Sequence, residues 1–331
     1  MKSEADWRPT SSHESMQARA CILATLRSFF AARGVLEVET PLLSAAAATA
    51  PHLQSLTTRY TGPFAPYGRE LFLQTSPEFA MKRLLAAGSG PIYQICKAFR
   101  NGEAGRVHNP EFTLVEWYRP GFDQHLLMDE VEALVMDLLA DVLAHKSSER
   151  ISYRDAFLRY VKVDIYTAST TELRDCAHAR NIVVPGLDHN DRDAWLELLL
   201  THIMEPQLGR GQLCFIYDYP ASQAALAKVR HNPPEPAVAE RFELYVNGVE
   251  LASGYRELAD SHEQRRRFEE DRAKRRGLQL DDVPVDEYLL AALDAGLPDC
   301  AGVALGLDRL IMLAIGATDL REVLTFPIEH A

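Results

Sequence analysis

The sequence predicts an α+β fold in which a mostly antiparallel sheet is flanked by helices. Long helices are indicated where apolar residues recur at the helical period, as in 15–33 and 126–144. Strand signals cluster elsewhere with only loops between them, for example at 92–100 and 112–118. Strands joined by loops pair antiparallel, because parallel pairing needs a longer crossover connection.

The elements follow one another in a regular order. The helix at 15–33 ends before Gly34, which stands where a left-handed helix cap forms, and a strand is predicted at 35–39. Further helices are predicted at 76–87, 191–203, 263–276 and 286–295, and further strands at 212–217, 242–246, 249–254 and 302–306. The proline-rich segment 231–236 is interpreted as a stiff loop within one domain, because strand signals resume directly after it.

Composition and charge exclude several classes of protein. The 331 residues are 47% hydrophobic and 25% charged, which is typical of a globular chain and excludes disorder and collagen. The net charge of −12 disfavours a broad nucleic-acid surface. The five cysteines are scattered without a C-x-x-C pair, so neither a disulfide framework nor a thiolate zinc site is indicated. No signal peptide and no apolar run near 18 residues is visible, so we expect a soluble cytoplasmic protein without a membrane span.

A predicted hairpin brings two glutamates together. Asn247-Gly248 between alternating residues indicates a two-residue turn, which places Glu243 opposite Ala252. Glu243 and Glu250 then share one face of the sheet as diagonal neighbours, about 7–8 Å apart. Two such carboxylates repel unless a proton or cation lies between them, and oxygen-only ligands suit Mg²⁺ or Mn²⁺ bridging to phosphates. The alternative is a solvated sheet surface with ordinary glutamates.

Two other units carry basic residues that suit phosphate. The predicted strands at 92–100 and 112–118 form a second hairpin-like unit. Arg100 ends its first strand, and Arg106 and His108 lie in the glycine-containing loop between the two strands, where they could clamp a polyphosphate. In the third unit, glycines at the end of a strand precede Arg309 at the start of an apolar helix, a place that favours anions. Each of these residues taken singly is more often solvated than functional. The chain contains neither a P-loop nor a dinucleotide fingerprint.

Together and in this order, these segments resemble the three signature motifs of class II aminoacyl-tRNA synthetases. The resemblance covers residues 34–43 for motif 1, 99–112 for motif 2 and 302–309 for motif 3. Within the class the match is closest to lysyl enzymes, at 75–85, 106–113 and 241–243. The resemblance implies a single class II synthetase-like catalytic domain over residues 1–331 and a homodimer through the motif 1 helix.

Two departures narrow the resemblance. Lysyl-tRNA synthetases carry an anticodon-binding barrel before motif 1, whereas only about fifteen residues precede the first helix here, and Ala304 stands where they usually have glycine. In both departures, and in the sequence of residues 114–121, the chain resembles the truncated paralogues that form the elongation factor P (R)-β-lysine ligase family. That resemblance implies ATP-dependent activation of (R)-β-lysine, or lysine, as an acyl-adenylate. The acyl group would then be transferred to a lysine ε-amine of elongation factor P, with AMP and pyrophosphate as products. The acidic chain fits this protein partner, and we do not expect tRNA to be one.

The resemblance also implies roles for particular residues. Arg100 would hold the α-phosphate of ATP and Arg309 the γ-phosphate, so these two are expected to be catalytic, and Phe112 would stack on adenine. The implied ATP-binding set is Arg100, Asn101, Gly102, Glu103, His108, Asn109, Phe112, Glu243, Leu244, Gly306 and Arg309. The implied substrate-binding set is Ser76, Pro77, Glu78, Glu116, Tyr118, Glu250, Glu257 and Ala304. Glu243 and Glu250 would hold Mg²⁺, in agreement with the hairpin.

One position conflicts with simple geometry. Strict alternation from Glu250 puts Glu257 on the opposite face of the sheet, so we expect a bulge near Ser253-Gly254, because bulges favour glycine. The reaction needs no side-chain nucleophile, since positioning and neutralisation of phosphate charge suffice. No base for the acceptor amine is identified, and Ala304 is the only hint of β-lysine over α-lysine.

Three other functions stay open at this point. The chain could be a minimal lysyl-tRNA ligase, or an inactive synthetase paralogue that acts as a regulatory or binding protein. Two facing glutamates argue against the inactive paralogue, which has no physical need for them. An ammonia-dependent asparagine synthetase shares the fold and the size, but the lysine-like segments and the acidic pocket disfavour it.

Overall fold

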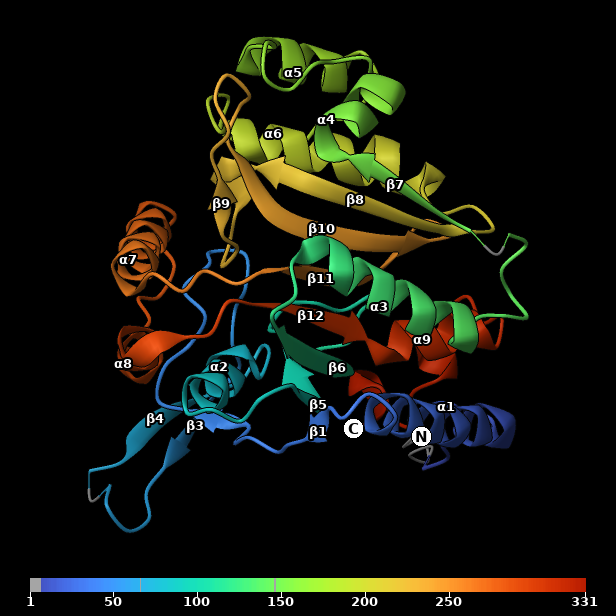
Figure 1. Cartoon of the computed structure of the whole chain (residues 1–331), viewed down its shortest axis with the longest axis vertical. Coiled ribbons are helices and arrows are strands. Elements are labelled where there is room, and N and C mark those ends of the chain that lie inside the picture. The colour runs from blue at the N-terminus through green and yellow to red at the C-terminus, as the bar shows by residue number, and fades with distance from the viewer. Residues whose placement is uncertain (1–6, 66, 146) are drawn as a thin grey trace, which may run out of the picture. The chain divides into compact units, whose positions relative to one another are not determined.

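The computed structural model describes residues 7–65, 67–145 and 147–331 (Figure 1). Contacts between residues group the chain into two compact units. Unit 1 comprises Met1–Gly121 and Ala259–Ala331, and unit 2 comprises Phe122–Leu258. The single catalytic domain expected over 1–331 stays a prediction.

The main sheet of unit 1 carries the motif 2 hairpin and the motif 3 strand. Its strands lie in the order β1 (Leu36–Glu37), β5 (Ile92–Phe99), β6 (Glu111–Pro120) and β12 (Cys300–Gly306). Strand β6 pairs antiparallel with both β5 and β12, as the sequence predicts, whereas β1 pairs parallel with β5. The register places Gln94 and Ala304 on either side of Glu116. Successive side chains alternate between faces, so these three residues share one face of the sheet.

The other face of this sheet is covered by the first helix. Phe30 of α1 (His13–Ala31) stacks on Tyr93 of β5 with ring centres 4.3 Å apart and meets Trp117 of β6 edge-on at 5.3 Å. All three side chains are buried. The apolar stripe of α1 thus covers one face of the sheet and leaves the Glu116 face for polar residues.

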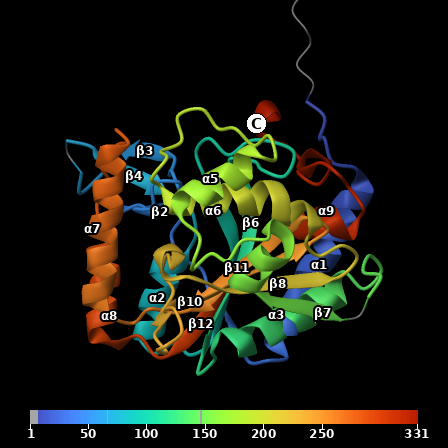
Figure 2. The ribbon, with the colours of Figure 1, turned by 90° about the horizontal axis from the view of Figure 1, so that it is seen from above.

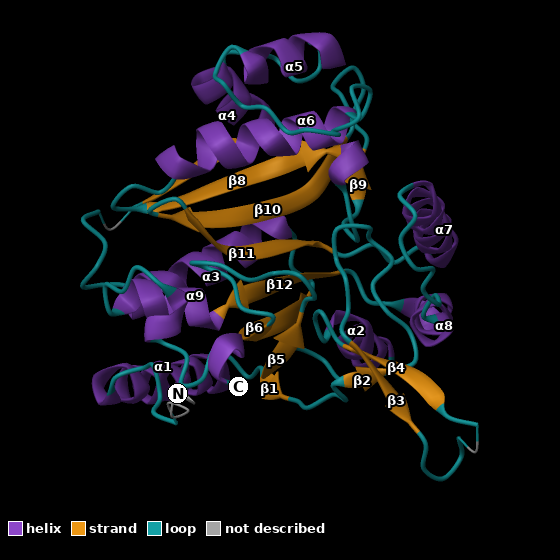
Figure 3. Ribbon diagram, turned by 180° about the vertical axis from the view of Figure 1, so that it is seen from behind, coloured by secondary structure: helices purple, strands orange, loops and turns teal. Residues whose placement is uncertain are grey.

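The remaining elements of unit 1 are shorter or lie outside this sheet. They are β2 (Leu43–Ser44), β3 (Thr57–Tyr60), β4 (Arg69–Leu73), α2 (Glu78–Ala86), α7 (Ser261–Gly277), α8 (Glu287–Gly296) and α9 (Leu307–Ala314). Strands β2, β4 and β3 form a second sheet, which stands apart from the first in Figure 3. Helix α2 packs on α8, and Figure 2 shows the long helix α7 along its length.

Unit 2 contributes further strands, with helices beside them. Its strands lie in the order β11 (Val249–Arg256), β10 (Val238–Val246), β8 (Leu213–Pro220) and β7 (Ser148–Ser152), with β9 (Val229–Arg230) beside β10. Strand β10 pairs antiparallel with β8, β9 and β11, and β7 pairs parallel with β8. The helices are α3 (Gln124–Leu138), α4 (Tyr153–Ala156), α5 (Thr170–His178) and α6 (Arg192–Leu199).

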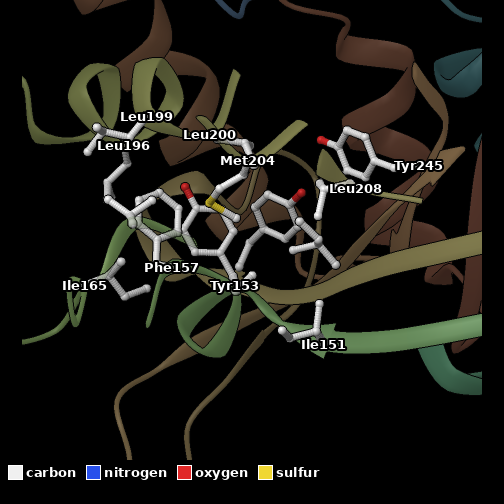
Figure 4. Close-up of a cluster of buried hydrophobic side chains, with 14 of the residues drawn as sticks. Ile151, Tyr153, Phe157, Ile165, Leu196, Leu199, Leu200, Met204, Leu208 and Tyr245 are labelled. Atoms are coloured by element: carbon white, nitrogen blue, oxygen red, sulfur yellow. The ribbon is translucent and has the colours of Figure 1, made fainter. Parts of the chain in front are cut away.

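A buried aromatic and aliphatic cluster joins α4 and α6 to one face of β8 and β10 (Figure 4). Tyr153 lies at its centre and contacts the rings of Phe157 at 4.8 Å and Tyr219 at 4.7 Å. Tyr245 of β10 belongs to the same cluster. Tyr245 therefore packs on the side of β10 that faces the helices.

The turn of the predicted hairpin is confirmed. Asn247 and Gly248 have φ angles of 50° and 77°, as a two-residue turn with two positive φ angles requires. Tyr245 lies opposite Glu250, as expected from that turn.

The register beyond the turn differs from the prediction. Glu243 lies opposite Ser253 and not opposite Ala252, because a bulge at Leu251 shifts the pairing by one residue. The bulge that Glu257 requires is therefore present, but it lies at Leu251, before the Ser253-Gly254 pair where we expected it. After the shift, alternation from Ser253 places Glu257 on the same face as Glu243. The glycine preference alone therefore did not locate the bulge.

Most other elements agree with the prediction to within a few residues. The helix expected at 126–144 is shorter, since α3 ends at Leu138. Strands β2, β3, β4, β7 and β9 and helices α4 and α5 were not predicted. All four residues of β3 are exposed, so that strand has no apolar alternation to reveal it. Among the described residues, no helix combines the length and the hydropathy needed to cross a bilayer.

Candidate active site

Arg100 follows β5 directly and is held by neighbours in the motif 2 segment. Its guanidinium lies over the Phe112 ring, 5.1 Å from the ring centre, and its Nη1 atom is 3.8 Å from Oε1 of Glu103. The Nε atom is buried and makes no hydrogen bond within the part of the chain that the structure describes. The backbone turns away at Asn101 and Gly102, whose φ of 84° suits glycine. Arg100 is therefore a cation held in position, and its buried Nε–H donor has no hydrogen-bond partner among the described residues.

Arg309, in the first turn of α9, contacts the same motif 2 loop. Its Nε donates to the Val107 carbonyl at 3.2 Å, and its Nη2 lies 2.7 Å from Nε2 of His108. Burial lowers the pKa of His108, and the positive charges of Arg309 and Arg100 lower it further, against the opposing charge of Glu103. His108 is therefore neutral at pH 7 and accepts from Arg309. Because both guanidiniums act on one imidazole, the two predicted phosphate arginines lie at the same loop.

Asn109 is buried in this loop, and its side chain is engaged at both ends. Its Oδ1 accepts from the backbone N–H of Ile328 at 3.1 Å, and its Nδ2 donates to the Glu111 carbonyl at 2.5 Å. The side chain thus ties the loop to the C-terminal segment, and its predicted place beside ATP stays a prediction. A cavity of about 270 Å³ lies between the loop and that segment, lined by Arg106, His108, Asn109, Asp319 and Arg321 among others.

Glu116 forms the centre of a polar socket on β6. Its carboxylate is buried and accepts from two hydroxyls, with Ser76 Oγ 2.6 Å from Oε2 and the Tyr118 phenol 2.6 Å from Oε1. The Ser76 hydroxyl also accepts from the Glu78 backbone N–H at 3.0 Å, next to Pro77 at the start of α2. The socket therefore joins the sheet to the first turn of α2.

A second carboxylate and an unpredicted lysine complete the socket. Nζ of Lys82 lies 2.6 Å from Oε1 of Glu78, one helical turn earlier on α2, and its side chain is only 1% exposed. Burial raises the pKa of Glu116 to about 7, and the Glu78 charge adds to this increase. The hydrogen bonds from Ser76 and Tyr118 and the charge of Lys82 oppose it. Two carboxylates with one internal ammonium suit a ligand that brings a further positive charge.

Residues with little or no side chain border the socket on β12. Ala304 pairs directly with Glu116, and Gly306 pairs with Leu114. Since the paired residues share a face, the methyl of Ala304 lies beside the Glu116 carboxylate.

In unit 2, Glu243 is held by three donors. Oε1 accepts from Nη2 of Arg241 at 2.5 Å, and Oε2 accepts from the phenols of Tyr219 and Tyr245, each at 2.6 Å. The carboxylate is buried. Arg241 also donates from Nη1 to the Gln223 carbonyl at 2.9 Å. These contacts fix the orientation of Glu243 before any ligand binds.

Glu250 and Glu257 lie on the Glu243 face, whereas Leu244 does not. Glu250 sits opposite Tyr245. Burial raises the pKa of the Tyr245 phenol, and the charges of Glu243 and Glu250 raise it further. The Leu244 side chain is fully buried, and alternation turns it to the other face, so only its backbone is available to a nucleotide. Glu257 is buried and bridges to Ala227.

The donor set decides what kind of metal site this unit can offer. No group of three or more His, Cys, Asp or Glu side chains within the described ranges is arranged to hold an ion. Two carboxylates nevertheless suit Mg²⁺, which typically binds one or two carboxylates and takes its other ligands from phosphates and water. Glu243 and Glu250 therefore fit a magnesium ion that arrives with a nucleotide, and that role stays a prediction.

The structure adds residues that the sequence interpretation omitted. Arg241 and Tyr245 flank Glu243 at two residues' distance, and Lys82 lies one turn after Glu78, so alternation and helical spacing could have identified them. Tyr219 is 24 residues from Glu243 and belongs to another strand, so no local signal identifies it.

Comparison with known proteins gives matches that cover the chain from end to end. Residues 2–330 match the family described as tRNA synthetases class II (D, K and N). The chain is 50% identical to a curated protein of Edwardsiella ictaluri and 49% identical to one of Pectobacterium carotovorum subsp. carotovorum. Each alignment spans 331 residues and all of both sequences. Both relatives bear the name elongation factor P–(R)-β-lysine ligase.

Proposed function

Because the chain belongs to the class II tRNA synthetase family of the D, K and N type, we propose that it is an ATP-dependent amino acid ligase. It activates (R)-β-lysine or lysine as an acyl-adenylate and transfers the acyl group to a lysine ε-amine of elongation factor P. Two full-length relatives with that name support this function over a tRNA ligase. The observation that carries the substrate class is the buried socket of Glu116 and Glu78, which suits an amine-bearing substrate.

The nucleotide is held by the motif 2 loop and the start of α9. Arg100 binds the α-phosphate, Arg309 the γ-phosphate, and the Phe112 ring stacks on adenine. The substrate carboxylate attacks the α-phosphorus and pyrophosphate leaves, while the guanidiniums neutralise the charge that develops on the phosphates. The acceptor amine then attacks the acyl carbonyl and AMP leaves.

Glu243 and Glu250 are the residues proposed to hold Mg²⁺. Their shared face and their carboxylate chemistry support this assignment. The ion would supply positive charge to the phosphates of ATP. The donors on Glu243 hold its carboxylate in a defined orientation for that purpose.

We further propose that the protein acts in the cytoplasm as a homodimer through the motif 1 segment. Leu36, Leu42 and Leu43 of that segment are large apolar side chains that are 58%, 38% and 45% exposed. A second copy would cover them, since exposed clusters of apolar side chains mark interaction sites.

Pyrophosphate exchange tests the first half of the reaction. The purified protein is expected to exchange label between pyrophosphate and ATP only when a lysine-type amino acid is present. Incubation with ATP, labelled (R)-β-lysine and either elongation factor P or total tRNA then identifies the acceptor. Label on elongation factor P is expected. Label on tRNA alone would support a minimal tRNA ligase, and no exchange with either lysine isomer would support an inactive paralogue.

The Glu116 socket predicts a pH dependence for the amino acid. Because the pKa of Glu116 is raised to about 7, this carboxyl is protonated below pH 7 and loses its attraction for an ammonium group. The KM for (R)-β-lysine in the exchange reaction is therefore expected to rise as the pH is lowered from roughly 8 to 6, by up to about tenfold per pH unit below the pKa. Glu116→Gln is the control, since it should raise KM and remove this dependence. A wild-type KM that stays constant across this range would contradict the role of Glu116.

A further inference from the structure

Asp308 is a buried carboxylate beside the proposed γ-phosphate residue. It immediately precedes Arg309 in the first turn of α9, and its side chain is only 3% exposed. Both carboxylate oxygens are engaged by groups from other parts of unit 1. A buried charge that is fully paired constrains the elements that supply its partners.

The partners of Asp308 come from distant parts of the chain. Oδ1 accepts from the Arg19 guanidinium of α1, 289 residues earlier in the sequence. Oδ2 accepts from the backbone N–H of Thr113 at 2.6 Å, directly after Phe112 on β6. The same Arg19 nitrogen also donates to the Val323 carbonyl at 3.1 Å. One carboxylate thus ties together the first helix, the motif 2 strand and the start of α9, and Arg19 adds the C-terminal segment.

The contacts of Arg309 depend on the distance between α9 and the motif 2 loop. Arg309 contacts Val107 and His108 of that loop. Phe112 lies at the start of β6, the strand that follows the loop. Asp308 bonds to β6 only one residue beyond Phe112. The Asp308–Thr113 bond therefore sets how far the base of the Arg309 side chain lies from the ring proposed to stack on adenine.

We propose that Asp308 and Arg19 are positioning residues for Arg309, and that their ion pair holds the two ends of the nucleotide site at a fixed separation. The inference rests on the proposed binding of ATP by Arg309 and Phe112. Neither residue touches the nucleotide in this scheme. Both act through the placement of α9 against β6, where an error of about 1 Å is enough to weaken catalysis by up to about 10²-fold.

The test uses near-isosteric variants that separate positioning from stability. Asp308→Asn keeps the side-chain shape and removes the charge, and Arg19→Met keeps the length of the side chain. Both are expected to raise the KM for ATP in pyrophosphate exchange about tenfold, with kcat at saturating ATP changed less than about threefold and the KM for (R)-β-lysine unchanged. Arg19→Lys keeps the charge and is expected to recover part of the loss.

A matched control lies on the same helix. Arg27 pairs with Glu37 at 3.2 Å, but both side chains are about half exposed, so Arg27→Met removes an ion pair without touching the nucleotide site. This variant is expected to keep the wild-type KM for ATP. If Asp308→Asn and Arg19→Met lower the melting temperature but leave that KM within about twofold of wild type, their role is structural only and the inference is overturned.

Direct nucleotide binding separates this inference from the proposed reaction. Equilibrium binding of a non-hydrolysable ATP analogue is expected to weaken about tenfold in Asp308→Asn and in Arg19→Met. If one of these variants does not fold, Arg19→Lys replaces it and is expected to weaken binding to a smaller degree. Wild-type protein that binds the analogue but exchanges no pyrophosphate would contradict only the reaction. Wild-type protein that binds no analogue would overturn the nucleotide site and this inference together.

Discussion

Arg100→Ala is expected to lower the rate of ATP–pyrophosphate exchange by about 10³-fold, with little change in the melting temperature. The guanidinium is proposed to neutralise charge on the α-phosphate in the transition state, and its buried Nε has no hydrogen bond among the described residues to satisfy it without a ligand. Removing a preorganised donor of this kind costs a large part of the rate. The exchange rate of Arg100→Lys should lie between the rates of the wild type and Arg100→Ala, because an ammonium keeps the charge but lacks the planar pair of donors.

The fold should tolerate this substitution. The Arg100 side chain is 31% exposed, its contact with Glu103 at 3.8 Å is long, and its stacking on Phe112 contributes about 1 kcal/mol or less. Lys97→Ala is the control. Lys97 lies near the end of β5, which Arg100 directly follows, but it pairs with Thr113 on the other face of the sheet and contacts Glu111 at the surface. If the exchange rate of Arg100→Ala is within a few-fold of the Lys97→Ala rate, the proposed role of Arg100 in the reaction is contradicted.

The second large effect is expected on stability, from Gly209→Ala. Gly209 has a φ of +63°, and a Cβ atom there would lie 2.4 Å from the Tyr245 backbone oxygen and 2.8 Å from its carbonyl carbon. Both are backbone atoms, so strand β10 would have to move. We expect a loss of about 2–5 kcal/mol in the free energy of unfolding, of which about 1–2 kcal/mol is the positive φ and the rest is the clash.

This substitution also affects the proposed metal residues. The Gly209 carbonyl accepts from Asn247 N–H at 2.7 Å, so the loop at Gly209 holds the hairpin turn against Tyr245. Because the Tyr245 phenol holds Glu243, the surviving folded protein should also lose activity.

Gly316→Ala separates the clash from the backbone strain. Gly316 has a φ of +70°, and nothing lies within 4 Å of the position that its Cβ would take. It should lose only the roughly 1–2 kcal/mol that a positive φ costs. Urea unfolding of the three proteins measures the difference. Equal losses in Gly209→Ala and Gly316→Ala would contradict the close approach to Tyr245.

Local chemistry explains which parts of the fold could be predicted. The Asn247-Gly248 turn was identified because only a few residue types accept two positive φ angles, and its first cross-strand pairs are confirmed. The class II fold and the ligase family were identified from short ordered motifs and are confirmed by relatives that match along the whole chain. The residues assigned to ATP, Mg²⁺ and the amino acid stay predictions, although Arg100, His108 and Arg309 lie at one loop as those roles require.

The register of the hairpin is a feature that the residues near the turn do not predict. The bulge at Leu251 moves the partner of Glu243 from Ala252 to Ser253, although Leu251 is not a glycine and gives no local signal of a bulge. The same holds for the socket, where the alternation along β6 places Glu116 and Tyr118 together but gives no sign that Ser76 donates to the same carboxylate.

The sequence by itself determined the helices and strands with strong periodicity, the turn at Asn247-Gly248 and the motifs that identify the family. Only the tertiary structure decided that Tyr219 donates to Glu243, that Ser76 donates to Glu116, and that Asp308 binds Arg19. Turns and periodic faces depend on residues a few positions apart, which a sequence displays directly. The contacts of a buried charge are set by whichever distant elements pack around it, and that arrangement exists only after the chain has folded.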